Sequence, residues 1–123
     1  MGMRDFRQLE VWEVAHQLVL ETYRVTATFP KHELYGLTSQ MRRCSASIAA
    51  NIAEGCGRSG NGDFHRFLST AMGSAVELEY FLMLSEDLGL MVDSYDELNS
   101  QAQRVQRMLA SLVRKVEAGR ARS

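Results

Sequence analysis

The feature that most constrains the fold is a long apolar stripe in the second half of this 123-residue sequence. Its residues recur with steps of 4, 3, 4, 3, 4 and 3: Phe64, Leu68, Ala71, Ala75, Leu78, Leu82 and Ser85. Such steps follow one face of an α-helix and do not fit the two-residue alternation of a half-buried strand. The stripe therefore predicts a helix over residues 61–88 that packs against neighbouring helices.

Three further segments, residues 10–27, 37–54 and 94–118, carry the same helical periodicity. Their predicted core faces are Val11, Trp12, Ala15, Leu18, Val19, Thr22 and Tyr23 in the first, Leu37, Met41, Cys44, Ile48 and Ile52 in the second, and Leu98, Ala102, Val105, Leu109, Leu112 and Val116 in the last. The connections between these segments are short. Four helices joined in this way predict an all-α fold, an antiparallel up-down-up-down four-helix bundle.

Proline and glycine residues set the expected boundaries of these helices. Pro30 disfavours helical geometry in the residue before it and so ends the first helix. Gly55 is predicted to cap the second helix in a left-handed conformation, and Gly119 is expected to close the fourth. We therefore expect an N-terminal arm over residues 1–9, a bundle over residues 10–119 and a frayed basic tail over residues 120–123.

A second seam runs beside the main stripe of the third predicted helix. Its members, Phe67, Ser74, Phe81 and Leu88, repeat every seven residues. Two adjacent seams make more apolar surface than one bundle helix needs. Either this helix touches two neighbours within the chain, or part of the surface meets another subunit.

Composition and charge place the chain among ordinary globular domains. Hydrophobic residues make up 46% of the chain and charged residues 24%. No apolar run approaches the roughly 20 residues that span a bilayer, and residues 1–10 lack the apolar core of a signal peptide. We therefore expect a cytoplasmic protein without membrane contact.

The net charge of −1 conceals a segregation of charge along the chain. Seven acids and no bases lie between residues 77 and 97, whereas six bases and one acid lie between residues 104 and 122. The basic segment could steer an acidic partner to the last helix. Alternatively, a helix with acids at its start and bases at its end simply matches the helix dipole.

The segment Gly55–Gly60 reads Gly-Cys-Gly-Arg-Ser-Gly and matches the G-x-G-x-x-G pattern of dinucleotide-binding proteins. In those proteins the glycines join a strand to a helix, and the pyrophosphate lies at the helix N-terminus. Here the segment follows a predicted helix, and no strand is predicted anywhere. We therefore expect no nucleotide and no other cofactor, although the start of the next helix with Arg58 could hold a single anion.

Other candidate reactive groups also lack the partner residues or the local structure that their chemistry needs. Glu13-x-x-His16 resembles half of a di-iron site, but neither His32 nor His65 has a Glu three residues before it. Cys44 and Cys56 are too few for a zinc site or a disulfide framework. Ser45, Ser47 and Ser74 lie on predicted helices without a nucleophile turn. The sequence therefore predicts no metal, no catalytic residue and no enzyme.

A polar stripe accompanies the core stripe of the second helix, and the third helix carries a comparable strip. The residues that we take as a candidate interface are Gln40, Arg43, Ser47, Asn51, Glu54, Arg58, Gly73, Ser74 and Glu77. Such stripes often only face water. These side chains are short or able to form pairs, however, and Arg43, Glu54 and Glu77 could form charge-assisted hydrogen bonds across an interface. A composite enzyme site between subunits is a third, minor possibility.

Several of these segments together resemble a known family. They include Phe29-Pro30-x-x-Glu33-x-x-Gly36-Leu37-Thr38-x-Gln40, the block Asn51-Ile52-Ala53-Glu54-Gly55, and Ala71-x-Gly73-Ser74-x-x-Glu77-Leu78-Glu79. The sequence resembles the 23S ribosomal RNA intervening-sequence proteins, which are four-helix bundles, over nearly its whole length. The resemblance implies a homo-oligomer, with a pentamer as the expected size.

Two functions follow as hypotheses. The first is a non-catalytic oligomeric scaffold or adaptor that engages itself and a protein partner. The second comes from a related branch, the accessory variability proteins of diversity-generating retroelements, which are basic pentamers that bind reverse transcriptase and nucleic acid. The candidate contacts for nucleic acid are Arg104, Arg107, Arg114 and Lys115. The net charge of −1 disfavours this alternative, because affinity depends on the number of phosphates neutralised.

Overall fold

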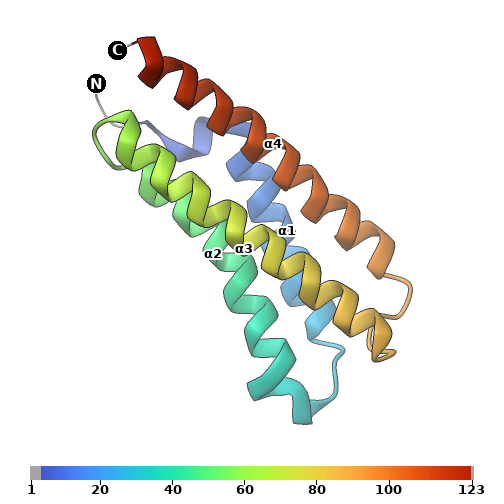
Figure 1. Ribbon diagram of the computed structural model, residues 1–123. Coiled ribbons are helices and arrows are strands. Elements are labelled where there is room, and N and C mark those ends of the chain that lie inside the picture. The colour runs from blue at the N-terminus through green and yellow to red at the C-terminus, as the bar shows by residue number, and fades with distance from the viewer. Residues whose placement is uncertain (1–3, 123) are drawn as a thin grey trace.

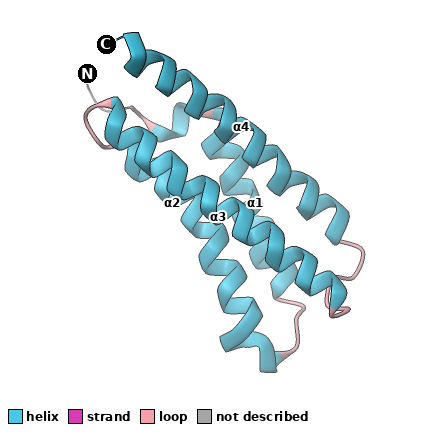
Figure 2. Ribbon diagram, in the orientation of Figure 1, coloured by secondary structure: helices cyan, strands magenta, loops and turns pink. Residues whose placement is uncertain are grey.

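A computed structural model describes residues 4–122 of the chain and shows an all-helical bundle (Figure 1). Its long helices are α1 (Glu10–Thr26), α2 (Ser39–Cys56), α3 (Asn61–Asp87) and α4 (Tyr95–Arg122). The described part of the chain contains no strand, and short loops connect the helices (Figure 2). Successive helices run in opposite directions, which confirms the predicted all-α four-helix bundle.

Three short helical segments complete the fold. A 3-10 turn, η1 (Phe6–Gln8), lies in the N-terminal arm. A second 3-10 turn, η2 (Lys31–Glu33), and a π-helical turn, η3 (Leu34–Thr38), form the connection that we expected between α1 and α2. Gly36 breaks the helical geometry inside η3, so α2 begins at Ser39, two residues later than predicted.

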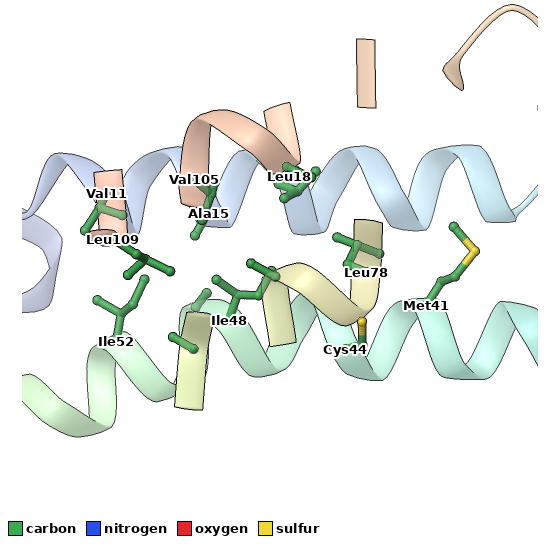
Figure 3. Packing of buried hydrophobic residues seen from close by; sticks show 14 of the residues in the cluster. Val11, Ala15, Leu18, Met41, Cys44, Ile48, Ile52, Leu78, Val105 and Leu109 are labelled. Carbon is green, nitrogen blue, oxygen red and sulfur yellow. The ribbon is translucent and has the colours of Figure 1, made fainter. Parts of the chain in front are cut away.

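The core lies along the axis of the bundle and takes side chains from all four helices (Figure 3). All seven residues of the 64–85 stripe are buried, and so are all five core residues predicted for the second helix, of which Leu37 lies in η3 and the other four in α2. In α4 the predicted stripe is also buried, except that Leu112 is only partly covered. Spacing alone was therefore sufficient to orient these three helices.

The buried face of α1 differs from the prediction. Val11, Ala15, Leu18 and Thr22 are buried as expected, but Trp12 and Val19 are only half-buried and Tyr23 is 44% exposed. The Trp12–Tyr23 side of α1 turns toward the edge of α2, where the Arg42 guanidinium lies 4.8 Å from the centre of the Tyr23 ring. The core face of α1 is completed by Val25 and Thr26 instead.

The second seam of α3 faces α2. Phe67, Ser74 and Phe81 are half-buried there, whereas Leu88 is 56% exposed at the end of the helix. On the opposite flank of α3, Gln106 and Gln103 of α4 donate hydrogen bonds to the Glu79 carboxylate over 2.9 and 3.1 Å, and these bonds lower its pKa. The third helix therefore contacts two neighbours within the chain.

Gly55 does not cap α2, contrary to the prediction. It is buried inside the helix, which ends at Cys56, and the following Gly57 has an ordinary right-handed conformation with φ −80°. A Cβ atom at Gly55 would lie 3.0 Å from Cδ1 of Phe64 and 3.0 Å from Cβ of Phe67. The glycine is therefore needed for the close approach of α2 and α3 rather than for a turn.

The first described residue, Arg4, and the last turns of α4 lie beside the turn between α2 and α3 (Figure 1). The backbone N–H of Arg4 donates to Cys56 O over 3.0 Å, and its guanidinium donates to Asn61 Oδ1 over 2.8 Å. The end predicted for α4 at Gly119 is wrong, because the helix continues to Arg122. One glycine costs a helix only about 1 kcal/mol, which does not force it to stop. Within the expected arm and tail, residues 1–3 and 123 lie outside the described residues.

We expect Gly55→Ala to lower the free energy of unfolding by about 1–3 kcal/mol, because its methyl group would push α2 and α3 apart. Urea denaturation measures this change. The matched control is Gly62→Ala in α3, where a Cβ atom would have no neighbour within 4 Å. Equal stability of the two variants would contradict the close approach at Gly55.

Candidate interaction surface

Polar side chains line the outer edge of the contact between α2 and α3; we call Gln40, Arg43, Ser47, Asn51, Ser74 and Glu77 the α2–α3 seam. The hydroxyl groups of Ser47 and Ser74 are hydrogen-bonded over 2.9 Å. Asn51 Nδ2 donates to the carbonyl oxygen of Ser47 over 2.8 Å and to its Oγ over 3.0 Å. The structure thus brings together the three central members of the predicted stripe.

The charged members of the predicted stripe divide into two groups. Glu54 of α2 pairs over 2.7 Å with Arg58 of the following turn, and the Arg58 guanidinium lies 5.2 Å from the centre of the Phe67 ring. Arg43 and Glu77, like Gln40, are exposed and form no side-chain hydrogen bond or ion pair with any described residue. The first pair is satisfied within the chain, and the other charges remain available.

An apolar ridge on the outer face of α3 was missed by sequence reasoning. Val76, Tyr80 and Met83 are 50%, 52% and 46% exposed, and Gly73 precedes them one helical turn earlier. Their spacing of four and three residues is itself a helical signal, but the stronger stripe of the buried face obscured it. A Cβ atom at Gly73 would have no neighbour within 4 Å, so no packing inside the chain requires a glycine there.

The candidate nucleic-acid contacts lie along α4. All four are exposed, and none forms an ion pair or hydrogen bond with a residue whose side chain the structure describes. Arg104 borders a hollow between α1 and α4 together with Glu10 and Glu13, and Lys115 lines a second hollow beside Glu10. Arg107 and Arg114, seven residues apart, share the outward face of the helix.

The thiol of Cys44, which lies beside the α2–α3 seam, stays protonated at neutral pH. Burial, with a smaller contribution from the charge of Glu77, raises the pKa of Cys44 to about 12. Cys44 Sγ donates to the carbonyl oxygen of Ser74 over 3.5 Å. A thiol that keeps its proton at neutral pH is a poor nucleophile and a poor metal ligand.

Other candidate sites have ordinary structural settings. The G-x-G-x-x-G segment spans the end of α2 and its turn into α3, so it does not join a strand to a helix. His16 stacks on Trp12 with ring centres 5.0 Å apart, while Glu13 is exposed. Across residues 4–122, no three His, Cys, Asp or Glu side chains gather closely enough to hold a metal ion. No helix in this range is long and apolar enough to cross a membrane.

Comparison with known proteins supports the resemblance read from the sequence. A family model described as 23S rRNA-intervening sequence protein matches residues 7–111. The chain belongs to this family. The matched range contains the whole α2–α3 seam and the apolar ridge, together with Arg104 and Arg107, whereas Arg114 and Lys115 lie beyond it.

A solved structure shows the same fold. It is a protein of unknown function from the S23 ribosomal protein family of Bacteroides thetaiotaomicron, with a TM-score of 0.78 and 22% sequence identity. The alignment covers 85% of this chain and 95% of that chain. No curated protein matches the chain. The family is thus established, and its name assigns no biochemical activity.

The raised pKa of Cys44 predicts a loss of stability in alkali. Its ordinary value is 9.0, so above about pH 9 the unfolded chain releases the thiol proton while the folded chain keeps it. The stabilising contribution is complete below pH 9 and is lost as the pH rises toward 12. Wild type should lose up to about 1.4 kcal/mol per pH unit more than Cys44→Ala in urea denaturation.

The control is Ser45→Ala, a buried neighbour without a thiol, which should follow the wild-type pH dependence. Identical alkaline slopes for wild type and Cys44→Ala would contradict a protonated, buried thiol.

Proposed function

We propose that this protein is a non-catalytic, self-associating scaffold of the cytoplasm that also engages a protein partner through its helical surfaces. The observation that carries the proposal is the apolar ridge of α3, with Gly73 beside three half-exposed apolar side chains. Gly73 lies near the middle of a 27-residue helix. A glycine in a helix interior is about 0.5–1 kcal/mol less favourable than alanine.

That cost has no compensation inside a single copy, because the space above Gly73 is open. A residue without a side chain lets another backbone approach closely. Val76, Tyr80 and Met83 would then lose their exposed apolar surface in the same contact, which favours association. The assembled form is our expectation, and the pentamer implied by the family resemblance is its expected size.

Chemistry on this face also favours binding over catalysis. The hydroxyl groups of Ser47 and Ser74 bond to each other, and the neighbouring thiol of Cys44 is held in its neutral form. A nucleophilic hydroxyl needs an adjacent general base, whereas here Ser47 has Ser74 and Asn51 as partners.

Gly73→Gln tests the scaffold proposal, because a long side chain would hold a second copy away from the ridge. Light scattering after size exclusion should show an oligomer for wild type at micromolar concentration and a smaller species for the variant. Helical circular dichroism should be unchanged, because the side chain enters open space. Gly62→Gln, at another open glycine of α3, should assemble like wild type.

A monomeric wild type at micromolar concentration would contradict the proposal. If the oligomer of Gly73→Gln had the same mass as that of wild type, the apolar ridge would not be part of the contact between copies.

The second candidate function is binding of nucleic acid, and the unpaired cations of α4 support it. Four described arginines elsewhere form ion pairs with carboxylates, namely Arg7, Arg24, Arg58 and Arg66. Arg107 and Arg114 have no such partner among the described side chains. Self-association would place several copies of this basic face in one particle and multiply a weak local attraction.

For this candidate we expect Arg107→Glu with Arg114→Glu to weaken binding of single-stranded DNA or structured RNA. Loss of two phosphate contacts should reduce the slope of log K against log salt by about 1.4–1.8. Fluorescence anisotropy over a salt series measures both quantities. The control, Arg24→Glu with Lys31→Glu, makes the same change of charge near the C-terminal end of α1. It should leave the slope of log K against log salt unchanged. Absent binding by wild type, or a flat salt response, would contradict this function.

A further inference from the structure

Two opposite charges face solvent on the α2–α3 seam at the same level of the bundle. Cys44 and Ser47 both contact Ser74, which fixes the alignment of the two helices. Arg43 precedes Cys44 on α2, and Glu77 follows Ser74 by three residues on α3, close enough for its charge to act on the Cys44 thiol. Both side chains are exposed, and they form no ion pair with each other.

Arg43 differs from the other described arginines of the arm and the first three helices. Arg4 and Arg42 donate hydrogen bonds to Asn61 and Thr26, and the remaining four pair with carboxylates. The Arg43 side chain forms no hydrogen bond or ion pair with any residue whose side chain the structure describes, although it also borders a hollow beside the exposed Tyr35. Glu77 carries the opposite charge, and its side chain likewise forms no ion pair with a described residue.

The surface beside these two charges carries only small side chains. Ser47 and Ser74 already bond to each other, Ala50 adds one methyl group, and Gly73 adds no side chain. A surface of this kind lets another helix approach closely without leaving a buried hydroxyl unsatisfied. Because it carries both an unpaired cation and an unpaired anion, it is complementary in charge to a copy of itself.

We propose that the α2–α3 seam contacts the seam of a second copy, with Arg43 of one copy paired to Glu77 of the next. The proposal rests on the self-association proposed above and names the contact that orients it. An arginine and a carboxylate can form two parallel hydrogen bonds, which fixes register as well as attraction. If the two seams meet face to face, the pair forms twice across a two-fold axis. If the α2 edge of one seam meets the α3 edge of the next, the contact is head-to-tail and the pair forms once at each boundary of a ring.

Charge reversal and charge exchange test this contact. Arg43→Glu and Glu77→Arg each place like charges opposite one another between copies, so each should raise the dissociation constant at least about tenfold. The double variant Arg43→Glu/Glu77→Arg exchanges the two charges and should assemble with nearly the wild-type constant. Arg24→Glu, an equal change of charge on α1, should have little effect.

Co-expression of the tagged double variant with untagged wild type separates contact between copies from contact within one chain. Mixed boundaries would place arginine against arginine or glutamate against glutamate, so the tagged protein should purify without wild type. Tagged wild type with untagged wild type is the positive control for mixing.

The outcomes distinguish this inference from the proposed function. Free mixing of the double variant with wild type, or unchanged assembly of Arg43→Glu, overturns the Arg43–Glu77 contact while wild-type self-association stands. A wild type that is monomeric at micromolar concentration overturns both. Sorting of the double variant from wild type, with restored assembly, supports the contact between copies.

Discussion

The rest of this structure depends on the close approach of α2 and α3. Gly55 makes the approach possible at one end of the contact, where even a methyl group would meet both Phe64 and Phe67. Near the middle of the contact, the hydroxyl groups of Ser47 and Ser74 are only 2.9 Å apart. Because the two helices pack so tightly, most of the seam formed by Phe67, Ser74, Phe81 and Leu88 is half-buried against α2. The surface that remains free lies on the outer side of the two helices.

The free surface of the α2–α3 pair carries both apolar and charged side chains. On the α2–α3 side, Gly73 joins the apolar ridge to the polar seam, so one continuous face combines exposed apolar side chains with the unpaired charges of Arg43 and Glu77. On the other flank of α3, Gln103 and Gln106 bind Glu79 and fix α4 in place. Val76 and Met83 lie three residues before and four residues after Glu79, so the apolar ridge borders the contact between α3 and α4.

The sequence predicted the architecture well because helical spacing encodes which residues are buried. It oriented α3 correctly at all seven positions of the stripe from Phe64 to Ser85. It failed at Gly55, because a glycine near a helix end is usually a cap and only the tertiary structure shows that Phe64 and Phe67 lie against it. It also misplaced the face of α1, since periodicity cannot say which flank a neighbouring helix covers. The stripe of candidate residues was found, but whether each charge is paired within the chain depends on rotamers and helix register that spacing does not determine.

In the proposed assembly, the native α2–α3 face is completed by another copy of the chain. The most direct test is the midpoint of thermal unfolding as a function of protein concentration. Association that occurs only in the folded state stabilises it by mass action, so the account predicts a Tm that rises steadily over a hundredfold increase in concentration. A Tm that stays constant over that range would mean that a single copy is the complete folded unit, and would contradict the account.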